Sequence, residues 1–128
     1  MTALRQLVSY GLVGGLQLVL DWACFVLMTA AGVAVVPANL AGRVAGASLG
    51  FWLNGRYTFA REGQPTLARR HALRFAAFWL ATTAASTLAV QAIDAREGLQ
   101  VAWLLKPLVE ALLAALGFLA ARHWIYRP

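Results

Sequence analysis

The sequence predicts an all-helical integral membrane protein with four transmembrane helices, and three observations lead to this fold class. Of its 128 residues, 61% are hydrophobic and only 12% are charged, whereas a soluble domain carries about 25% charged residues. The apolar residues form runs that approach or exceed the roughly 20 residues a spanning helix needs. The arginines cluster between these runs, which is typical of membrane topology and not of a nucleic-acid-binding groove. We therefore expect one transmembrane domain over residues 1–128 and no nucleic-acid partner.

The first two helices form a hairpin. The first is predicted at residues 7–31, an apolar run interrupted only by Gln17 and Asp21. After a short turn the second is predicted at residues 38–54, with Asn39 as a candidate cap at its start. This helix carries glycine at every fourth position, which lets a neighbouring backbone approach closely. The helix-packing stripe consists of Gly42, Gly46 and Gly50.

The second half repeats this plan after a basic cytoplasmic loop at residues 56–74. Helices are predicted at residues 75–93 and 101–121, joined by a turn at residues 94–98. The loop carries five arginines against one glutamate, namely Arg56, Arg61, Arg69, Arg70, Arg74 and Glu62. Four spans place both termini and this loop on one side, together with Arg5, Arg122 and Arg127. Because arginine and lysine favour the cytoplasmic side, both termini are predicted to be cytoplasmic.

An internal repeat supports two tandem hairpins. A shift of 67 residues lays Leu49-Gly50-Phe51 on Leu116-Gly117-Phe118. The same shift lays Tyr57 on Trp124 and Phe59 on Tyr126. Since each half has two spans, the repeats are parallel and related by an axis along the membrane normal.

Four charged residues lie within or just inside the predicted spans: Asp21, Arg43, Lys106 and Glu110. A charge at the bilayer centre costs about 2.5–3.5 kcal/mol, so each should face the bundle interior. Their charges sum to zero, and two pairs of opposite sign could form. One interpretation is a cavity that passes a polar or anionic group; the other is a neutral network that holds the helices together. Gln17 and Trp22 could line the same cavity, Trp22 by stacking on a sugar.

Catalysis has no visible machinery in the sequence. There is no nucleophile beside a base, no metal-ligand spacing and no glycine-rich phosphate loop after a strand. The single cysteine, Cys24, lies in an apolar run and excludes a disulfide framework within the chain. We expect neither an enzyme nor a metal or cofactor.

The chain resembles the GtrA-like family of small four-helix membrane proteins over nearly its whole length. The resemblance rests on Gly14 and Asp21 in the first helix and on two motifs at helix ends. These are Phe51-x-x-Asn54-x-Arg56-Tyr57-x-Phe59 and Phe118-x-x-x-Arg122-x-Trp124-x-Tyr126. Gly50, Gly55 and Gly117 depart from the family pattern, which often has polar residues there.

The resemblance implies movement of a polyprenyl-phosphate-linked sugar, with undecaprenyl phosphate as one candidate carrier, across a bacterial inner membrane. Such lipids serve O-antigen modification and cell-wall polysaccharide synthesis. Arg43 and Lys106 would then bind the phosphate, and Asp21 and Glu110 the sugar hydroxyls. Capture of the anionic headgroup at the cytoplasmic face would fall to Asn54, Arg56 and Arg122.

Three functions therefore remain open. The first is a lipid-linked sugar flippase, expected to be a homodimer because four short helices enclose little space. The second is a non-transporting membrane partner that anchors a polyprenyl-phosphate glycosyltransferase. The third is a small multidrug-type exporter, against which the buried cations Arg43 and Lys106 count because they repel cationic drugs.

Overall fold

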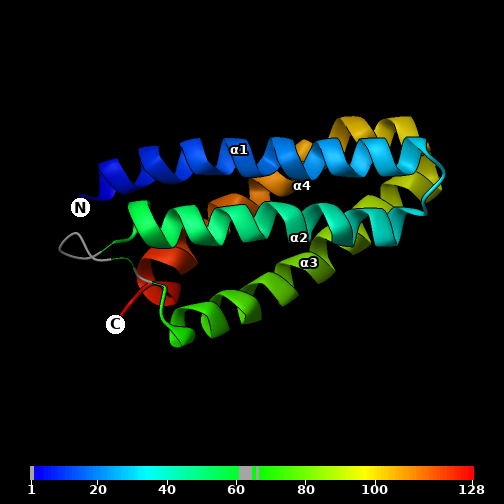
Figure 1. Cartoon of the computed structure of the whole chain (residues 1–128). Coiled ribbons are helices and arrows are strands. Elements are labelled where there is room, and N and C mark those ends of the chain that lie inside the picture. Colours follow the sequence, from blue (N-terminus) through cyan, green and yellow to red (C-terminus); the bar gives the residue numbers. More distant parts are fainter. Residues whose placement is uncertain (1, 61–64, 66) are drawn as a thin grey trace.

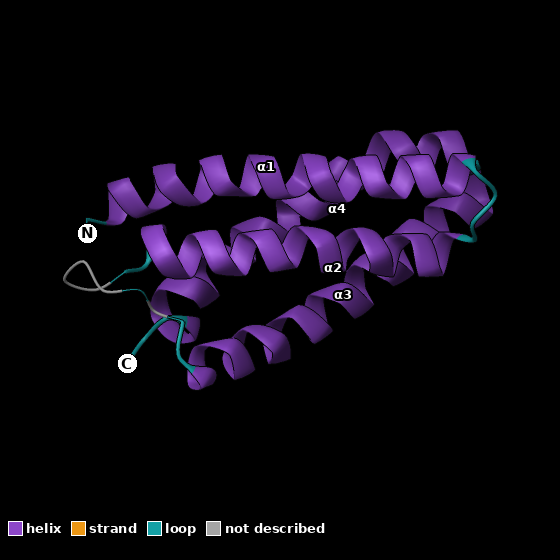
Figure 2. Ribbon diagram, in the orientation of Figure 1, coloured by secondary structure: helices purple, strands orange, loops and turns teal. Residues whose placement is uncertain are grey.

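The described residues form four α-helices and two short π-helical segments, with no strand among them. They comprise residues 2–60, 65 and 67–128 of a computed structural model (Figures 1 and 2). The α-helices are α1 (Ala3–Ala30), α2 (Val35–Leu53), α3 (Arg69–Glu97) and α4 (Leu99–Ala120). The π-helical segment η1 (Asn54–Thr58) continues α2, and η2 (Ala121–Ile125) continues α4. The chain is thus all-helical over its described part.

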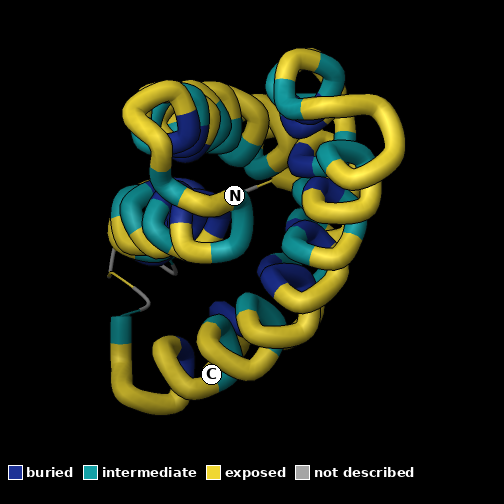
Figure 3. Tube along the Cα trace, turned by 90° about the vertical axis from the view of Figure 1, so that its right-hand side faces the viewer, coloured by how far each residue is buried: buried dark blue, intermediate teal, exposed yellow. Residues whose placement is uncertain are grey.

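Three helical segments are long and apolar enough to cross a membrane, as judged from the described residues. They are Ala3–Ala30, Arg69–Glu97 and Leu99–Ile125. Helix α2 is not among them, and it carries Asn39 and Arg43 on its buried face. Many large apolar side chains are exposed on the outside of the bundle. Figure 3 shows the buried residues turned toward its inside. This arrangement suits a bundle surrounded by lipid.

The helix bounds correct the predicted ones. Helix α1 begins at Ala3, where the hydroxyl of Thr2 accepts a hydrogen bond from the backbone N–H of Arg5. Helix α3 was predicted at residues 75–93 but runs six residues further toward the N-terminus and continues to Glu97. The prediction stopped at the ends of the apolar runs, whereas backbone hydrogen bonding continues through polar residues beyond them.

Two predicted connections are therefore shorter than expected. The turn predicted at residues 94–98 reduces to Gly98, whose φ of 93° suits glycine. In the predicted loop at residues 56–74, three of the arginines lie in α3, namely Arg69, Arg70 and Arg74. Arg61 and Glu62 lie outside the described residues.

The two helical hairpins, α1–α2 and α3–α4, point in the same direction along the bundle. Both termini and the connection between η1 and α3 lie at one end of the bundle, here called the terminus end (Figure 1). The turns between α1 and α2 and between α3 and α4 lie at the other, the turn end. Helix α3 diverges from α2 toward the terminus end. The shift of 67 residues also appears in the structure, because adding 67 to the bounds of η1 gives those of η2.

Two apolar clusters fill the two ends of the bundle. The turn-end cluster is built on Phe25, Ala38, Val90 and Ala102. The terminus-end cluster consists mainly of aromatic rings: Phe59 and Tyr126 are its buried centre, with Tyr10, Phe51, Phe75, Phe78 and Phe118 packed around them. Between these clusters lies a layer of buried polar and charged groups.

Candidate functional site

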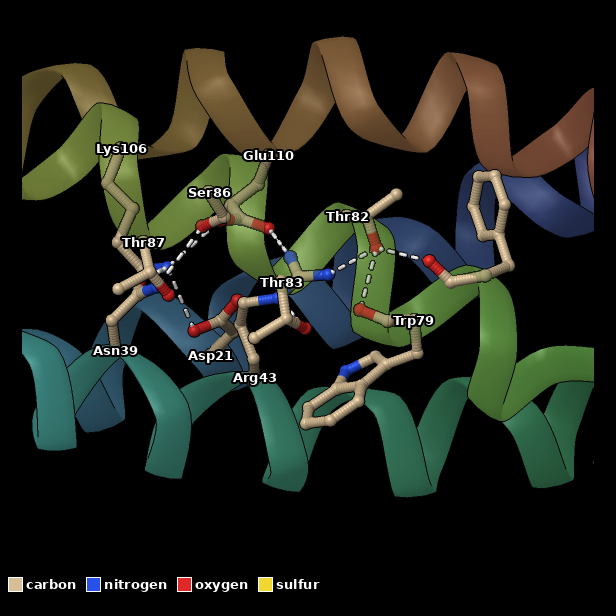
Figure 4. Close-up of polar contacts among 11 residues, drawn as sticks. Asp21, Asn39, Arg43, Trp79, Thr82, Thr83, Ser86, Thr87, Lys106 and Glu110 are labelled. Atoms are coloured by element: carbon tan, nitrogen blue, oxygen red, sulfur yellow. Dashed lines mark hydrogen bonds and ion pairs between the residues drawn. The ribbon is translucent and has the colours of Figure 1, made fainter.

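Three of the four helices bring four charged residues together in the buried layer (Figure 4). Asp21 comes from α1, Arg43 from α2, and Lys106 and Glu110 from α4. None is more than 9% exposed. Two cations face two carboxylates, so their charges cancel. Isolated charges would be costly here, and pairing with added hydrogen bonds is what makes buried ions tolerable.

Lys106 is the innermost member of the charge cluster. Its Nζ lies 3.2 Å from Asp21 Oδ1 and 3.1 Å from Glu110 Oε1. It also donates a hydrogen bond to Asn39 Oδ1 at 2.6 Å. Its hydrogen bonds go to Asn39 and Glu110, whereas its contact with Asp21 Oδ1 is an ion pair, and that oxygen is buried without a hydrogen-bond partner among the described residues. Lys106 is fully buried and does not line the cavity described below. In this arrangement it contacts the two carboxylates, and phosphate binding by Lys106 stays a prediction.

Arg43 faces α3 and α4 through its guanidinium. Nε donates to Thr83 Oγ1 and Nη2 donates to Thr82 Oγ1, both at 2.8 Å. Nη1 is ion-paired with Glu110 Oε2. A guanidinium has five N–H donors, so within the described residues these bonds leave one donor on each of Nη1 and Nη2. Arg43 lines the cavity, and it is the cation that remains available to a ligand.

Several polar residues of this layer were missed or misread in the sequence. Asn39 was expected to cap α2, but it lies inside the helix and donates to Ser86 Oγ at 3.2 Å and to Thr87 Oγ1 at 3.0 Å. Ser86 in turn donates to Glu110 Oε1. The available signal was the spacing of Thr82, Thr83, Ser86 and Thr87, because residues three and four apart share one helix face.

The repeat explains how the cluster is assembled. Residues 39 and 106 are 67 apart, and so are residues 43 and 110. Asn39 is hydrogen-bonded to Lys106, and Arg43 is ion-paired with Glu110. Repeat-equivalent positions therefore contact one another across the line that relates the two hairpins. In each pair the two repeats carry different residues whose side chains complement one another, an amide with an ammonium group and a guanidinium with a carboxylate.

A cavity of about 90 Å³ extends from the charge cluster toward the terminus end. Asp21, Arg43 and Glu110 line its inner part, and Asn54 and Tyr126 line it near the terminus end. Asn54 Oδ1 is buried without a hydrogen-bond partner among the described residues, as is Nε1 of Trp79, which also lines the cavity. At roughly 30 Å³ per water, this space has room for about three water molecules. Its unsatisfied groups suit a polar occupant.

The other predicted site residues fall in different places. Gln17 lines the cavity, but Trp22 does not: it is 37% exposed and donates to the backbone carbonyl of Trp103 at 2.7 Å. Trp22 thus lies outside this cavity, and its stacking on a sugar stays a prediction. Arg56 is exposed at the terminus end, with its guanidinium 5.6 Å from the ring centre of Trp52. Arg122 is half-buried, and its Nη1 has no partner within the described residues.

The glycine stripe is used inside the chain, against α1. A Cβ at Gly46 would lie 3.0 Å from the backbone oxygen of Gln17, and one at Gly42 would lie 2.6 Å from that of Asp21. A Cβ at Gly50 would collide with the side-chain amide of Gln17. The close approach that brings Asp21 and Gln17 into the interior therefore depends on these glycines, and the stripe is not free for a partner.

Aromatic packing closes the cavity at the terminus end. The rings of Phe59 and Tyr126, which are repeat-equivalent, stack with their centres 5.0 Å apart. The hydroxyl of Tyr126 donates to the carbonyl of Phe51 at 3.0 Å. Burial, and to a lesser extent the nearby Tyr10 phenol, raises the pKa of the Tyr126 phenol, so it remains a neutral donor.

The fold and this site together define a helical membrane protein with a neutral ion-pair network beneath a small polar cavity. Within the described residues no group of three or more His, Cys, Asp or Glu side chains could hold a metal ion. The family model of the GtrA/DPMS transmembrane domain matches residues 9–126. The chain therefore belongs to the GtrA/DPMS transmembrane-domain family. It is accordingly a membrane protein of the polyprenyl-phosphate sugar family. No curated protein and no solved structure matches it.

Proposed function

We propose that the protein moves a polyprenyl-phosphate-linked sugar across a bacterial cytoplasmic membrane, for use in surface polysaccharide. All four helices would cross the membrane, with both termini and the basic connection in the cytoplasm. No covalent bond changes in this process, so the protein acts as a transporter and not as an enzyme. The lipid tail stays in the bilayer while the phosphosugar passes through the bundle.

One observation carries the proposal: Arg43 lies at the inner part of a polar cavity, and two of its guanidinium N–H donors make no hydrogen bond within the described residues. An Arg guanidinium matches the oxygens of a phosphate better than any other side chain. Asp21 and Glu110 line the same space, and their carboxylates accept hydrogen bonds from sugar hydroxyls. The chemistry of the cavity therefore suits a headgroup that is both anionic and rich in hydroxyls.

The cavity is too small for this headgroup in the conformation described. Ligand pockets usually measure about 300–1,000 Å³, against about 90 Å³ here. Transport of such a headgroup would therefore require the helices to separate from the arrangement described. Movement of α2 away from α1 and α4 would leave Lys106 paired with both carboxylates but would break the Arg43–Glu110 pair.

Basic residues at the terminus end suit the capture of anionic lipid. The exposed arginines there are Arg5, Arg56, Arg69, Arg70 and Arg127. Each contributes about 1 kcal/mol of attraction to an anionic membrane surface. This concentration of charge favours binding of the lipid from the cytoplasmic leaflet.

The test is transbilayer movement of a polyprenyl-phosphate sugar in proteoliposomes. Wild-type protein should move the lipid well above the rate of empty liposomes, and Arg43→Gln and Asp21→Asn should each abolish this movement. Arg96→Gln, on the exposed surface near the turn end, is the matched control and should retain most of it. A wild-type rate equal to that of empty liposomes refutes the proposal.

A second candidate function is supported by the small volume of the cavity. A protein that never opens would serve instead as a membrane partner of a polyprenyl-phosphate glycosyltransferase, presenting its basic terminus end for docking. Co-purification of such an enzyme, with Arg43→Gln and Asp21→Asn fully active in polysaccharide synthesis, would favour this function. Whether the protein works as a homodimer is tested in the same preparation by measuring its mass in detergent.

A further inference from the structure

We propose that an apolar groove between α2 and α3 holds the hydrocarbon tail of the lipid whose headgroup enters the polar cavity. This inference rests on the proposed function and specifies the path by which such a lipid enters. The groove measures about 300 Å³. Four residues of α2 line it, namely Val44, Ala47, Ser48 and Phe51. The α3 side is formed by Ala72, Phe75, Ala76 and Trp79.

The groove is apolar and lies on the side of the bundle. Ser48 is its one hydroxyl-bearing residue, and that hydroxyl donates to the carbonyl of Val44 at 2.8 Å, within α2. A polar ligand would therefore find little to bind. The small side chains of Ala72 and Ala76, both exposed, leave room between the helices where α3 diverges from α2 (Figure 1). A single hydrocarbon chain suits this space.

The groove and the cavity share a wall. Phe75 and Trp79 line both spaces, so these two side chains lie between the groove and the polar interior. Figure 4 shows the indole of Trp79 reaching from α3 toward α2. Its Nε1 is buried and has no hydrogen-bond partner among the described residues. An indole N–H at this junction is placed to donate to a phosphate oxygen where the tail joins the headgroup.

Continuity with the cavity identifies the occupant. A chain attached to a phosphate near Arg43 must leave the interior sideways, because the aromatic cluster blocks the terminus end and the turn-end cluster blocks the other. The boundary formed by Phe75 and Trp79 opens directly onto the groove. The groove therefore receives the tail of the same lipid, and outward movement of the two side chains admits its headgroup.

The test uses a polyprenyl phosphate with a photoreactive diazirine in the first isoprene units of its tail. Binding to purified protein is measured first, by co-purification without illumination. Illumination should then place adducts on residues 44–51 and 72–79. Ala76→Phe, which fills the groove, should lower the adduct yield about tenfold, the equivalent of about 1.4 kcal/mol. Ser48→Leu is a second groove variant with the same expected direction.

Ala115→Phe is the matched control. Residue 115 is the repeat equivalent of Ser48, is an exposed alanine on α4 and lines neither space. Its adduct yield should equal that of wild type. If the probe binds but the adducts fall elsewhere, or persist in Ala76→Phe and Ser48→Leu, the groove assignment is wrong and the proposed function stands. If the probe does not bind, the proposed function fails as well. A disulfide between two copies of Ala76→Cys would show a second copy in the groove and overturn the assignment.

Discussion

Removing one member of the Arg43–Glu110 pair should destabilise the protein far more than removing an exposed arginine. Arg43→Met leaves two carboxylates against Lys106, and Glu110→Gln leaves two cations against Asp21. Each variant thus places one unbalanced charge in a layer where the remaining groups are at most 9% exposed. Breaking a buried pair in this way costs about 3–5 kcal/mol. Arg43→Met also removes the hydrogen bonds that the guanidinium donates to Thr82 Oγ1 and Thr83 Oγ1.

The double variant Arg43→Met/Glu110→Gln restores neutrality, because Lys106 and Asp21 remain. Its destabilisation should be smaller than the sum of the two single effects by about 2–3 kcal/mol, within the range for directly contacting residues. Reversible unfolding in mixed micelles, followed by tryptophan fluorescence, measures all three variants. Arg56→Gln is the control and should change the unfolding free energy by about 0.5 kcal/mol or less. Single effects as small as that, or additivity within about 0.5 kcal/mol, would refute the buried-pair argument.

Two further predictions concern packing. Gly46→Ala should destabilise the protein by about 1–3 kcal/mol, because its Cβ meets the Gln17 backbone. Gly14→Ala should be neutral, because no atom lies within 4 Å of the added methyl. Thermal melts of the two variants in one detergent measure the difference, and equal melting points would contradict the prediction. Tyr126→Phe loses the hydrogen bond to the Phe51 carbonyl and should cost about 0.5–1.5 kcal/mol in the same melts, with a stability equal to wild type as the contrary result.

The sequence predicted the features that depend on one helix at a time. Apolar runs located the helices, and the cost of intramembrane charge indicated that Asp21, Arg43 and Glu110 face the interior. The repeat shift of 67 residues was also readable, from aromatic and glycine positions. These inferences need only composition, spacing and the preference of lipid for apolar groups.

Features that depend on which helices face one another could not be predicted. Spacing places Lys106 on the same face as Glu110, but only the packing shows that its ammonium group also contacts Asn39 and Asp21 and does not line the cavity. Trp22 follows Asp21 directly, yet consecutive residues on a helix point about 100° apart, so it faces outward to Trp103. Asn39 was read as a cap because local propensity was the only available evidence.

The most direct test of a phosphate site at Arg43 is the phosphorus–nitrogen dipolar coupling between bound polyprenyl phosphate and isotopically labelled arginine guanidinium groups, measured by solid-state NMR in lipid bilayers. Dipolar coupling reports only nitrogen and phosphorus atoms that lie close together. We predict a coupling in wild type that disappears in Arg43→Gln and persists in Arg56→Gln. A coupling that survives in Arg43→Gln and disappears in Arg56→Gln would place the phosphate on the surface and contradict the site.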